Sequence, residues 1–220
     1  ALIVPDQGAG FDYREMASQL TAEHPSLRHV IVDGDCGPFL SWSSIAEYDG
    51  PPVERTAVDP ALPALLLVSG GTTGLPKPIV HGQGGIIINM YACGLHNDVG
   101  ASYGENNRGE RYHWFSSTGW VMWNAQLAGL MSGTTCVIYD GSPGGPKDAP
   151  DWSVLWRFAA RHRVTFFGAG AAFYANCMKA GVDLAACGDL SRIWAIGSTG
   201  SPLAADVQAW GTEQFKRISS

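Results

Sequence analysis

The amino-acid sequence predicts an α/β protein in which helices cover both faces of a mainly parallel sheet. Short apolar runs of strand length alternate along the chain with segments of helical periodicity, and such alternation implies parallel strands joined by helices. The 220 residues are 45% hydrophobic and 15% charged, which supplies enough apolar side chains for a real core. This length suits one domain, or one and a half.

The first predicted element is a helix that begins near Phe11. Asp12 is placed to cap the helix, and Pro25 ends it. Its apolar face consists of Phe11, Met16, Ala17 and Leu20. Because these positions recur at helical spacing, this face is expected to pack against a sheet.

The other elements follow from the same apolar patterns. The predicted strands are residues 27–32, 64–68, 112–117, 134–141, 164–168 and 193–197. The later predicted helices are residues 86–96, 119–133, 151–163 and 171–180, and one from about 203. The helix over 151–163 is strongly amphipathic, since Trp152, Leu155, Trp156 and Ala159 fall at i, i+3, i+4 and i+7. The stretches 49–63 and 98–111 are expected to be surface connections.

The charge and the cysteines exclude several classes of protein. A net charge of −6 and a pI near 5.4 argue against a nucleic acid or a membrane surface as partner. The sequence has no run of 18 apolar residues, and its first residues lack the pattern of a signal peptide. The five cysteines form no CxxC pair, so neither a metal site nor a disulfide framework is indicated. We therefore expect small buried thiols in a reduced, cytoplasmic protein.

The stretch from Val68 to Gly82 reads VSGGTTGLPKPIVHG and has the composition of a phosphate-binding loop. Glycines after a strand expose backbone N–H groups, and a following helix would add its positive dipole end. The hydroxyls of Thr72 and Thr73 add donors, and Lys77 adds a positive charge in an extended segment between two prolines. Two common phosphate motifs are absent: the chain has no Gly-Lys pair, and its GAGAAF and GQGGII segments lack the third glycine of GxGxxG.

The same loop resembles the Ser/Thr-rich phosphate loop of the adenylate-forming acyl-CoA synthetase superfamily. The matching residues are Ser69, Gly71, Thr72, Thr73, Gly74, Pro76 and Lys77. Val68, Gly70 and Pro78 depart from the commonest residues of the motif. The segments SSTGWVMWN, YDGSPGGPKDAPDWSVLW and GSTGSPL resemble the acetoacetyl-CoA synthetase branch in order and spacing. The resemblance extends from about Phe11 to the end of the chain, except for residues 97–111.

The resemblance implies ATP-dependent activation of a carboxylate, with coenzyme A and Mg²⁺ also required. In that family the carboxylate attacks the α-phosphate of ATP, and the thiol of coenzyme A then displaces AMP from the acyl-adenylate. The residues that would hold the ATP phosphates are Ser69, Gly71, Thr72, Thr73, Gly74 and Lys77. Those matching the adenine and ribose segment are Gly200, Ser201 and Pro202. Those matching the acyl pocket are Trp120, Val121, Met122, Asn124 and Thr199.

The resemblance also implies what this sequence leaves to other parts of its parent. The segments that carry the family's Mg²⁺-binding Glu and its catalytic lysine have no counterpart here. We therefore expect residues 1–220 to be a fragment of the AMP-binding N-terminal domain, inactive without the rest of its chain, and to contribute no metal ligand. The expected partners are a small carboxylate, ATP and coenzyme A.

Several alternatives stay open from the sequence alone. The resemblance favours an acetoacetate–CoA ligase as the parent protein. The nearest alternative is an acetyl- or propionyl-CoA synthetase of the same superfamily. A third alternative is a nucleotide-binding module without ligase chemistry. The tryptophans of the helix at 119–133 are also typical core residues. Asn124 needs a hydrogen-bond partner, and a backbone carbonyl would serve as well as a ligand. His81 is placed to close over a nucleotide or to be structural, and His113 fits a structural role better.

Overall fold

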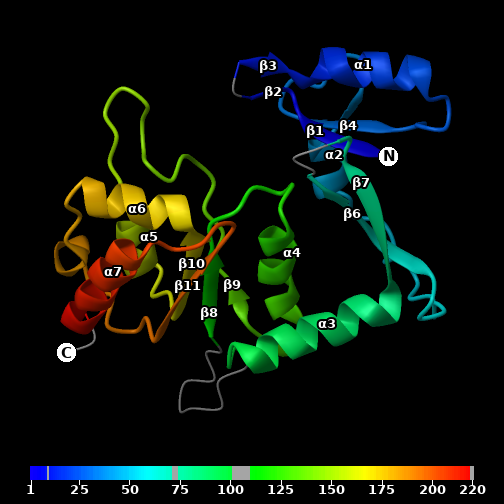
Figure 1. The fold of residues 1–220 in the computed structure, drawn as a ribbon. Helices are drawn as coiled ribbons and strands as arrows, with labels where there is room; N and C mark the ends of the chain where they lie inside the picture. Colours follow the sequence, from blue (N-terminus) through cyan, green and yellow to red (C-terminus); the bar gives the residue numbers. More distant parts are fainter. Residues whose placement is uncertain (9, 71–73, 101–109, 219–220) are drawn as a thin grey trace. The chain divides into compact units, whose positions relative to one another are not determined.

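The computed structural model describes residues 1–8, 10–70, 74–100 and 110–218, which form two compact units, Ala1–Ala57 and Val58–Ser220. The α/β class and the parallel strands predicted from the sequence are confirmed (Figure 1). No helix in these ranges is both long enough and apolar enough to cross a bilayer. None of the five cysteines is in a disulfide; Cys177 and Cys187 are buried as expected, whereas Cys93 is exposed.

The first unit is a small parallel sheet with one main helix. Its strand order is β1-β4-β5, and a two-stranded hairpin joins β1 to the helix. The elements are β1 (Leu2–Pro5), β2 (Gln7–Gly8), β3 (Phe11–Asp12), α1 (Tyr13–Glu23), β4 (Val30–Asp33), β5 (Leu40–Ser41) and α2 (Ser43–Ala46). Ala17 of α1 is buried against Val30 and Val32 of β4. The predicted place of Phe11 in the helix was wrong, because Phe11 belongs to the hairpin and is 51% exposed.

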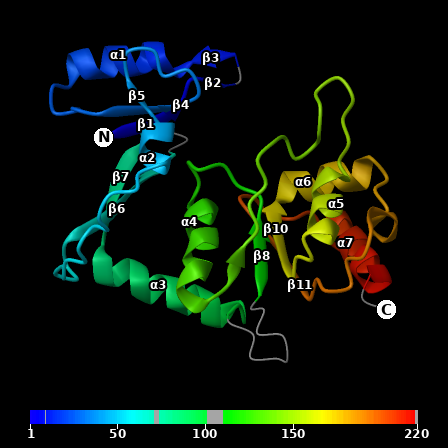
Figure 2. The ribbon, with the colours of Figure 1, turned by 180° about the vertical axis from the view of Figure 1, so that it is seen from behind.

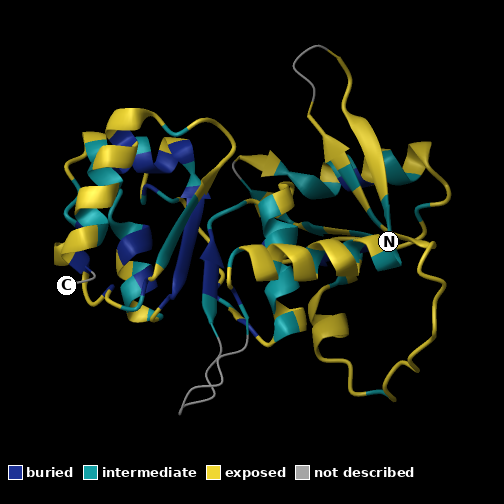
Figure 3. Ribbon diagram, turned by 60° about the horizontal axis from the view of Figure 1, so that its bottom comes forward, coloured by how far each residue is buried: buried dark blue, intermediate teal, exposed yellow. Residues whose placement is uncertain are grey.

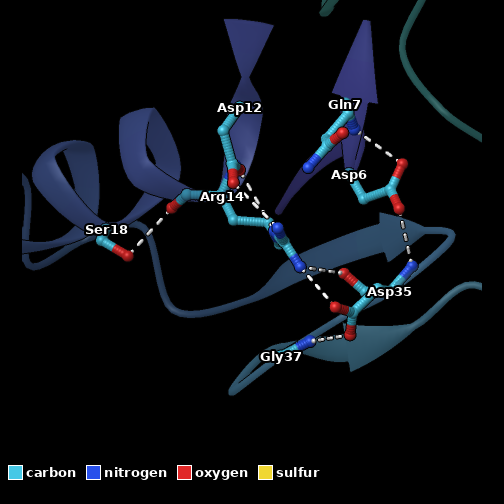
Figure 4. A network of polar contacts seen from close by, with 7 residues as sticks. All are labelled: Asp6, Gln7, Asp12, Arg14, Ser18, Asp35 and Gly37. Atoms are coloured by element: carbon cyan, nitrogen blue, oxygen red, sulfur yellow. Dashed lines mark hydrogen bonds and ion pairs between the residues drawn. The ribbon is translucent and has the colours of Figure 1, made fainter.

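A polar network ties the start of α1 to the ends of β1 and β4 (Figure 4). Asp12 caps the helix as predicted, since its Oδ1 accepts the backbone N–H of Arg14 at 2.9 Å. The Arg14 guanidinium also binds Oδ2 of Asp12 at 2.8 Å and Oδ2 of Asp35 at 2.6 Å. Its hydrogen bond lowers the pKa of Asp12 to about 2. These side chains lie at the surface, where ion pairs add little stability, so the network mainly fixes the local direction of the chain.

The second unit is built around a four-stranded parallel sheet in the order β11-β10-β8-β9. Its strands are β8 (Arg111–Trp114), β9 (Thr135–Cys136), β10 (Phe166–Gly170) and β11 (Ala195–Thr199). The covering helices are α4 (Val121–Ala128), α5 (Val154–Arg161), α6 (Ala171–Lys179) and α7 (Ala205–Ile218). Short 3₁₀ helices are η1 (Gly129–Ser132) and η2 (Leu184–Cys187). Helix α4 lies on one face of the sheet, and α5, α6 and α7 lie on the opposite face (Figures 1 and 2).

The main core lies between the sheet and α5 and α6 (Figure 3). Leu155, Trp156 and Ala159 of α5 are fully buried, which confirms three of the four residues of the predicted amphipathic face. Trp152 lies before the helix and is partly buried against the same core. The indole of Trp156 stacks on the ring of Phe167 in β10, with ring centroids 4.2 Å apart. Gly133 ends the α4–η1 segment as predicted, in a left-handed conformation with φ of 77°.

The region around the glycine-rich loop differs from the prediction. The loop joins two antiparallel strands, β6 (Pro63–Ser69) and β7 (Lys77–Gly82), and α3 (Gln83–His96) begins only after β7. No helix N-terminus therefore follows the loop directly, because the Pro-Lys-Pro segment stays extended as its prolines require. The predicted strand at 64–68 is confirmed as part of β6. It is mostly exposed, because β6 pairs only with β7 within the described residues.

Candidate functional site

Two neighbouring parallel strands, β10 and β11, end at the same edge of the sheet in the second unit. Gly170 ends β10 and pairs in register with Thr199, the last residue of β11. Thr199 is followed by Gly200, Ser201 and Pro202, which the family resemblance assigns to adenine and ribose. Ligands of α/β proteins bind outside the carboxyl ends of parallel strands. The β11 turn is therefore in a position that suits a nucleotide.

Gly200 gives this turn its shape. Its φ of +93° is a conformation that residues other than glycine rarely adopt, and a Cβ built on it would meet no described residue within 4 Å. The turn is therefore open on its outer side. Ser201 and Pro202 are exposed beside it, so a flat ring has access to this part of the backbone.

A cavity of about 680 Å³ lies between α3, α4, the β6–β7 hairpin and one face of the sheet. Four residues predicted for the acyl pocket line it: Val121, Met122, Asn124 and Thr199. Trp120 does not line it, because its indole precedes α4 and is 62% exposed. The imidazole of His81 in β7 lies on the wall formed by the hairpin. These placements bring most of the predicted acyl residues to one hollow.

The side-chain amide of Asn124 faces this hollow and has no hydrogen-bond partner within the described ranges. A half-buried amide normally has a partner. Asn124 therefore offers a free donor and a free acceptor to whatever enters the cavity.

The described ends of the glycine-rich loop fit an anion. Ser69 and Lys77 face each other in the last pair of the hairpin, and the Ser69 hydroxyl donates to the Lys77 carbonyl at 3.3 Å. The Lys77 side chain is exposed, and a Cβ built on Gly70 or Gly74 would meet no described residue within 4 Å. The positive charge of Lys77 is therefore accessible to an anion at the described end of the loop. Gly71, Thr72 and Thr73, which the sequence assigns to the phosphates, lie outside the described residues.

Metal binding has less support in the same ranges. Among the described residues, no three His, Cys, Asp or Glu side chains gather closely enough to hold an ion. The chemistry that Mg²⁺ would supply is neutralisation of phosphate charge, and in the described part of the chain only Lys77 of the predicted loop offers a positive charge for that task.

Two residues that the sequence did not single out hold the cavity in shape. Gln126 of α4 is buried, and its Oε1 accepts the backbone N–H of Trp114 in β8. The Cys136 thiol of β9 donates to the Gln126 carbonyl at 2.9 Å. Gln126 thus fastens α4 to two strands and fixes the turn that carries Met122 and Asn124. The sequence signal for this role was the presence of a polar residue, Gln126, inside the otherwise apolar helix VMWNAQLA.

His113 lies on the opposite face of the sheet and is structural. Its ring is 1% exposed, beside Phe158 and Phe167, and Nδ1 lies 2.7 Å from the Val137 carbonyl. Burial lowers the pKa of His113 to about 4, so the ring is neutral at pH 7 and Nδ1–H donates to that carbonyl. Nε2 has no hydrogen-bond partner in the described ranges.

Residues 1–220 all match the family model described as AMP-binding enzyme. The chain belongs to the AMP-binding enzyme family. This confirms the resemblance read from the glycine-rich loop, and it agrees with the position of the β11 turn at the carboxyl edge of the sheet.

Three members of the family illustrate the extent of the similarity. A solved acetoacetyl-CoA synthetase from Streptomyces lividans has a TM-score of 0.81 and 39% identity, covering 98% of this chain and 33% of that one. The acetoacetyl-coenzyme A synthetase of Rhizobium meliloti is 39% identical over 146 residues, 64% of this chain and 20% of its own. The salicyl-AMP ligase / salicyl-S-ArCP synthetase of Mycobacterium tuberculosis is 53% identical over 91 residues, 41% of this chain and 16% of its own. The chain thus spans between 16% and 33% of the length of these three proteins.

Proposed function

We propose that this chain is the nucleotide- and acyl-binding part of an AMP-forming acid–thiol ligase that converts acetoacetate to acetoacetyl-CoA. One observation carries the proposal. Val121, Met122, Asn124 and Thr199, assigned to the acyl pocket by resemblance, line one cavity of about 680 Å³. The acetoacetyl-CoA synthetases among the relatives support the choice of acid.

The phosphate loop supplies donors and charge rather than a nucleophile. Phosphate chemistry of this kind depends on positioning and charge stabilisation. The Ser69, Thr72 and Thr73 hydroxyls and the glycine N–H groups would donate to the phosphates, and Lys77 would balance their charge. The turn from Gly200 to Pro202 would lie against adenine and ribose. The carboxylate of the acid then attacks the α-phosphate, pyrophosphate leaves, and the coenzyme A thiol later displaces AMP.

The acyl cavity provides the basis for recognising acetoacetate. Acetate ends in a methyl group, whereas acetoacetate carries a second carbonyl that needs a donor once it is buried. The Asn124 amide has no partner in the described part of the chain and faces the cavity, so its NH₂ group is available to that keto oxygen. Met122 is flexible enough to pack against the rest of the acyl group.

A carboxylate panel on the full-length protein tests the proposal. We expect a higher kcat/KM for acetoacetate than for butyrate, acetate or propionate. Butyrate is the informative control, because it matches acetoacetate in length but lacks the ketone. Because butyrate has no acceptor for the Asn124 amide, the hydrogen bond to the keto oxygen should favour acetoacetate by about 0.5–1.5 kcal/mol. Equal or better activity with butyrate, acetate or propionate would assign the protein to a different short-chain acid.

Salicylate belongs in the same panel as the second candidate. The stretch that is 53% identical to a salicyl-AMP ligase favours it, and a cavity of this size has room for an aromatic ring. Preference for salicylate would replace acetoacetate as the acid and keep the ligase assignment. A protein that binds ATP but activates no acid in the panel would be a nucleotide-binding module.

A further inference from the structure

A row of three residues crosses the sheet beneath the cavity. Trp114 of β8 pairs with Gly168 of β10, and Gly168 pairs with Gly197 of β11. Residues paired in register on adjacent strands point to the same face of the sheet. On that face, Trp114 is therefore followed by two residues that have no side chain.

The Trp114 indole occupies the space that both glycines leave. A Cβ built on Gly168 would lie 2.1 Å from Cε3 of the indole and 2.3 Å from Cδ2. A Cβ built on Gly197 would lie 2.5 Å from Cζ3 and 2.8 Å from Cη2. Carbon atoms in contact are separated by about 3.5–4.0 Å. The six-membered ring thus extends from β8 across β10 to β11, and only glycine at both positions permits this.

The same ring forms part of the cavity wall. Trp114 lines the cavity together with Met122 of α4 and with Thr199, which lies two residues beyond Gly197 on β11. Met122 also packs against the cluster of Tyr112, Trp114 and Phe166. The indole is 8% exposed, so it is held firmly against the sheet. Its position therefore sets how deep the cavity is on the side of the sheet.

We propose that Trp114, seated on Gly168 and Gly197, determines how long an acyl chain the cavity accepts. This inference rests on the proposed function, because it assigns the cavity to the acyl group of a carboxylate. A smaller ring at Trp114 deepens the cavity, and a methyl group at Gly197 pushes the indole into it. Each methylene that gains a buried position raises kcat/KM about fourfold.

The test is the chain-length profile of the full-length protein, measured as kcat/KM for straight-chain acids from acetate to octanoate. Trp114→Phe should move the best substrate about two carbons longer and raise kcat/KM for hexanoate relative to butyrate about sixteenfold. Gly197→Ala should shift the profile toward acetate by a similar factor. Trp152→Phe makes the same ring change beside the core on the other face of the sheet. This control should leave the profile unchanged.

A double variant separates a specificity role from a structural one. Phe lacks the outer indole atoms that a Cβ at Gly197 would strike, although the contact to Phe166 Cε1 at 3.2 Å remains. Gly197→Ala should therefore cost much less in the Trp114→Phe protein than in the wild type, which a double-mutant cycle measures. Additive effects, or an unchanged profile in Trp114→Phe, overturn the inference.

The outcomes distinguish this inference from the proposed function. If the wild type prefers acetoacetate and Trp114→Phe leaves the chain-length preference unchanged, the proposed function is supported and the proposed role of Trp114 is rejected. If salicylate is the best acid but Trp114→Phe still favours longer straight-chain acids, the role of Trp114 is supported and acetoacetate is rejected as the substrate. If no acid is activated, equilibrium binding of butyrate and octanoate replaces kinetics. Trp114→Phe must then tighten octanoate binding relative to butyrate, and no such change overturns the inference.

Discussion

The two faces of the four-stranded sheet are built from alternate residues of the same strands, yet they differ in packing. On the face of α5 and α6, Phe167 and Ala169 are fully buried against Trp156 and its neighbours. On the face of α4, Tyr112, Trp114 and Phe166 bury one another beside a hollow of about 680 Å³. Successive side chains of a strand point to opposite faces. The same short strands therefore contribute both to a close-packed core and to the wall of a cavity.

The difference separates stability from recognition. A close-packed face loses free energy with every atom removed, because neighbours relax only partly into the space. A face that already carries a cavity loses less stability, but a change there alters what the cavity accepts. Substitutions on the two faces should therefore have effects of different kinds.

The largest effect is expected from Trp156→Ala on the packed face. Trp156 is fully buried and stacks on Phe167, and such truncations cost about 3–5 kcal/mol. Met122→Ala, beside the cavity, should cost clearly less in a urea denaturation of the full-length protein but should change the relative kcat/KM of the acids. Equal losses of stability in the two variants would mean that the faces are packed alike.

His113 should make the packed face sensitive to acid. Its pKa is lowered by burial to about 4 from an ordinary value near 6.5. Between these two pH values the unfolded chain binds a proton that the folded chain does not, so the free energy of unfolding falls as the pH falls. The loss reaches up to about 3 kcal/mol near pH 4, and His113 has no such effect above pH 6.5.

The variant His113→Gln provides the measurement. Glutamine has no titrating ring in this range but keeps an N–H donor for the Val137 carbonyl, which His113 holds at 2.7 Å. Unfolding free energies measured from pH 7 to pH 4 should fall more steeply for the wild type than for the variant. Parallel curves would show that another group governs the acid response.

Prediction from the sequence succeeded where the signal was local. Asp12 capping α1 and the periodicity of α5 each depend on residues within a few positions of one another. The Trp114–Gly168–Gly197 row could not be predicted from the sequence, because strand register joins positions that are far apart in the chain. The prediction of a helix directly after the glycine-rich loop was wrong for a related reason. The antiparallel pairing of β6 with β7 cannot be recognised from the apolar run of β6 alone.

The phosphate loop should show effects on function without effects on stability. The motif assigns Thr72 and Thr73 to the ATP phosphates, and losing a hydrogen bond to a charged group costs roughly 1.5–3 kcal/mol. Thr72→Ala and Thr73→Ala should each lower adenylation efficiency about ten- to a hundredfold in the full-length protein, with an unchanged urea midpoint. Near-normal pyrophosphate exchange in both single variants and in the double variant would make the loop a simple turn.

The smallest effect, and the most specific, is expected at Asn124. Leucine has the same branched side-chain shape as asparagine but cannot donate to a keto oxygen, and a neutral hydrogen bond contributes about 0.5–1.5 kcal/mol. Asn124→Leu should therefore reduce the ratio of kcat/KM for acetoacetate to that for butyrate about two- to tenfold, mainly by lowering the value for acetoacetate. Asn176→Leu is the matched control, because it makes the same change on α6, across the sheet from the cavity. If both variants lower the ratio equally, the change reflects general loosening of the fold. If neither does, the keto oxygen is bound by another group, and the cavity face discriminates by shape alone.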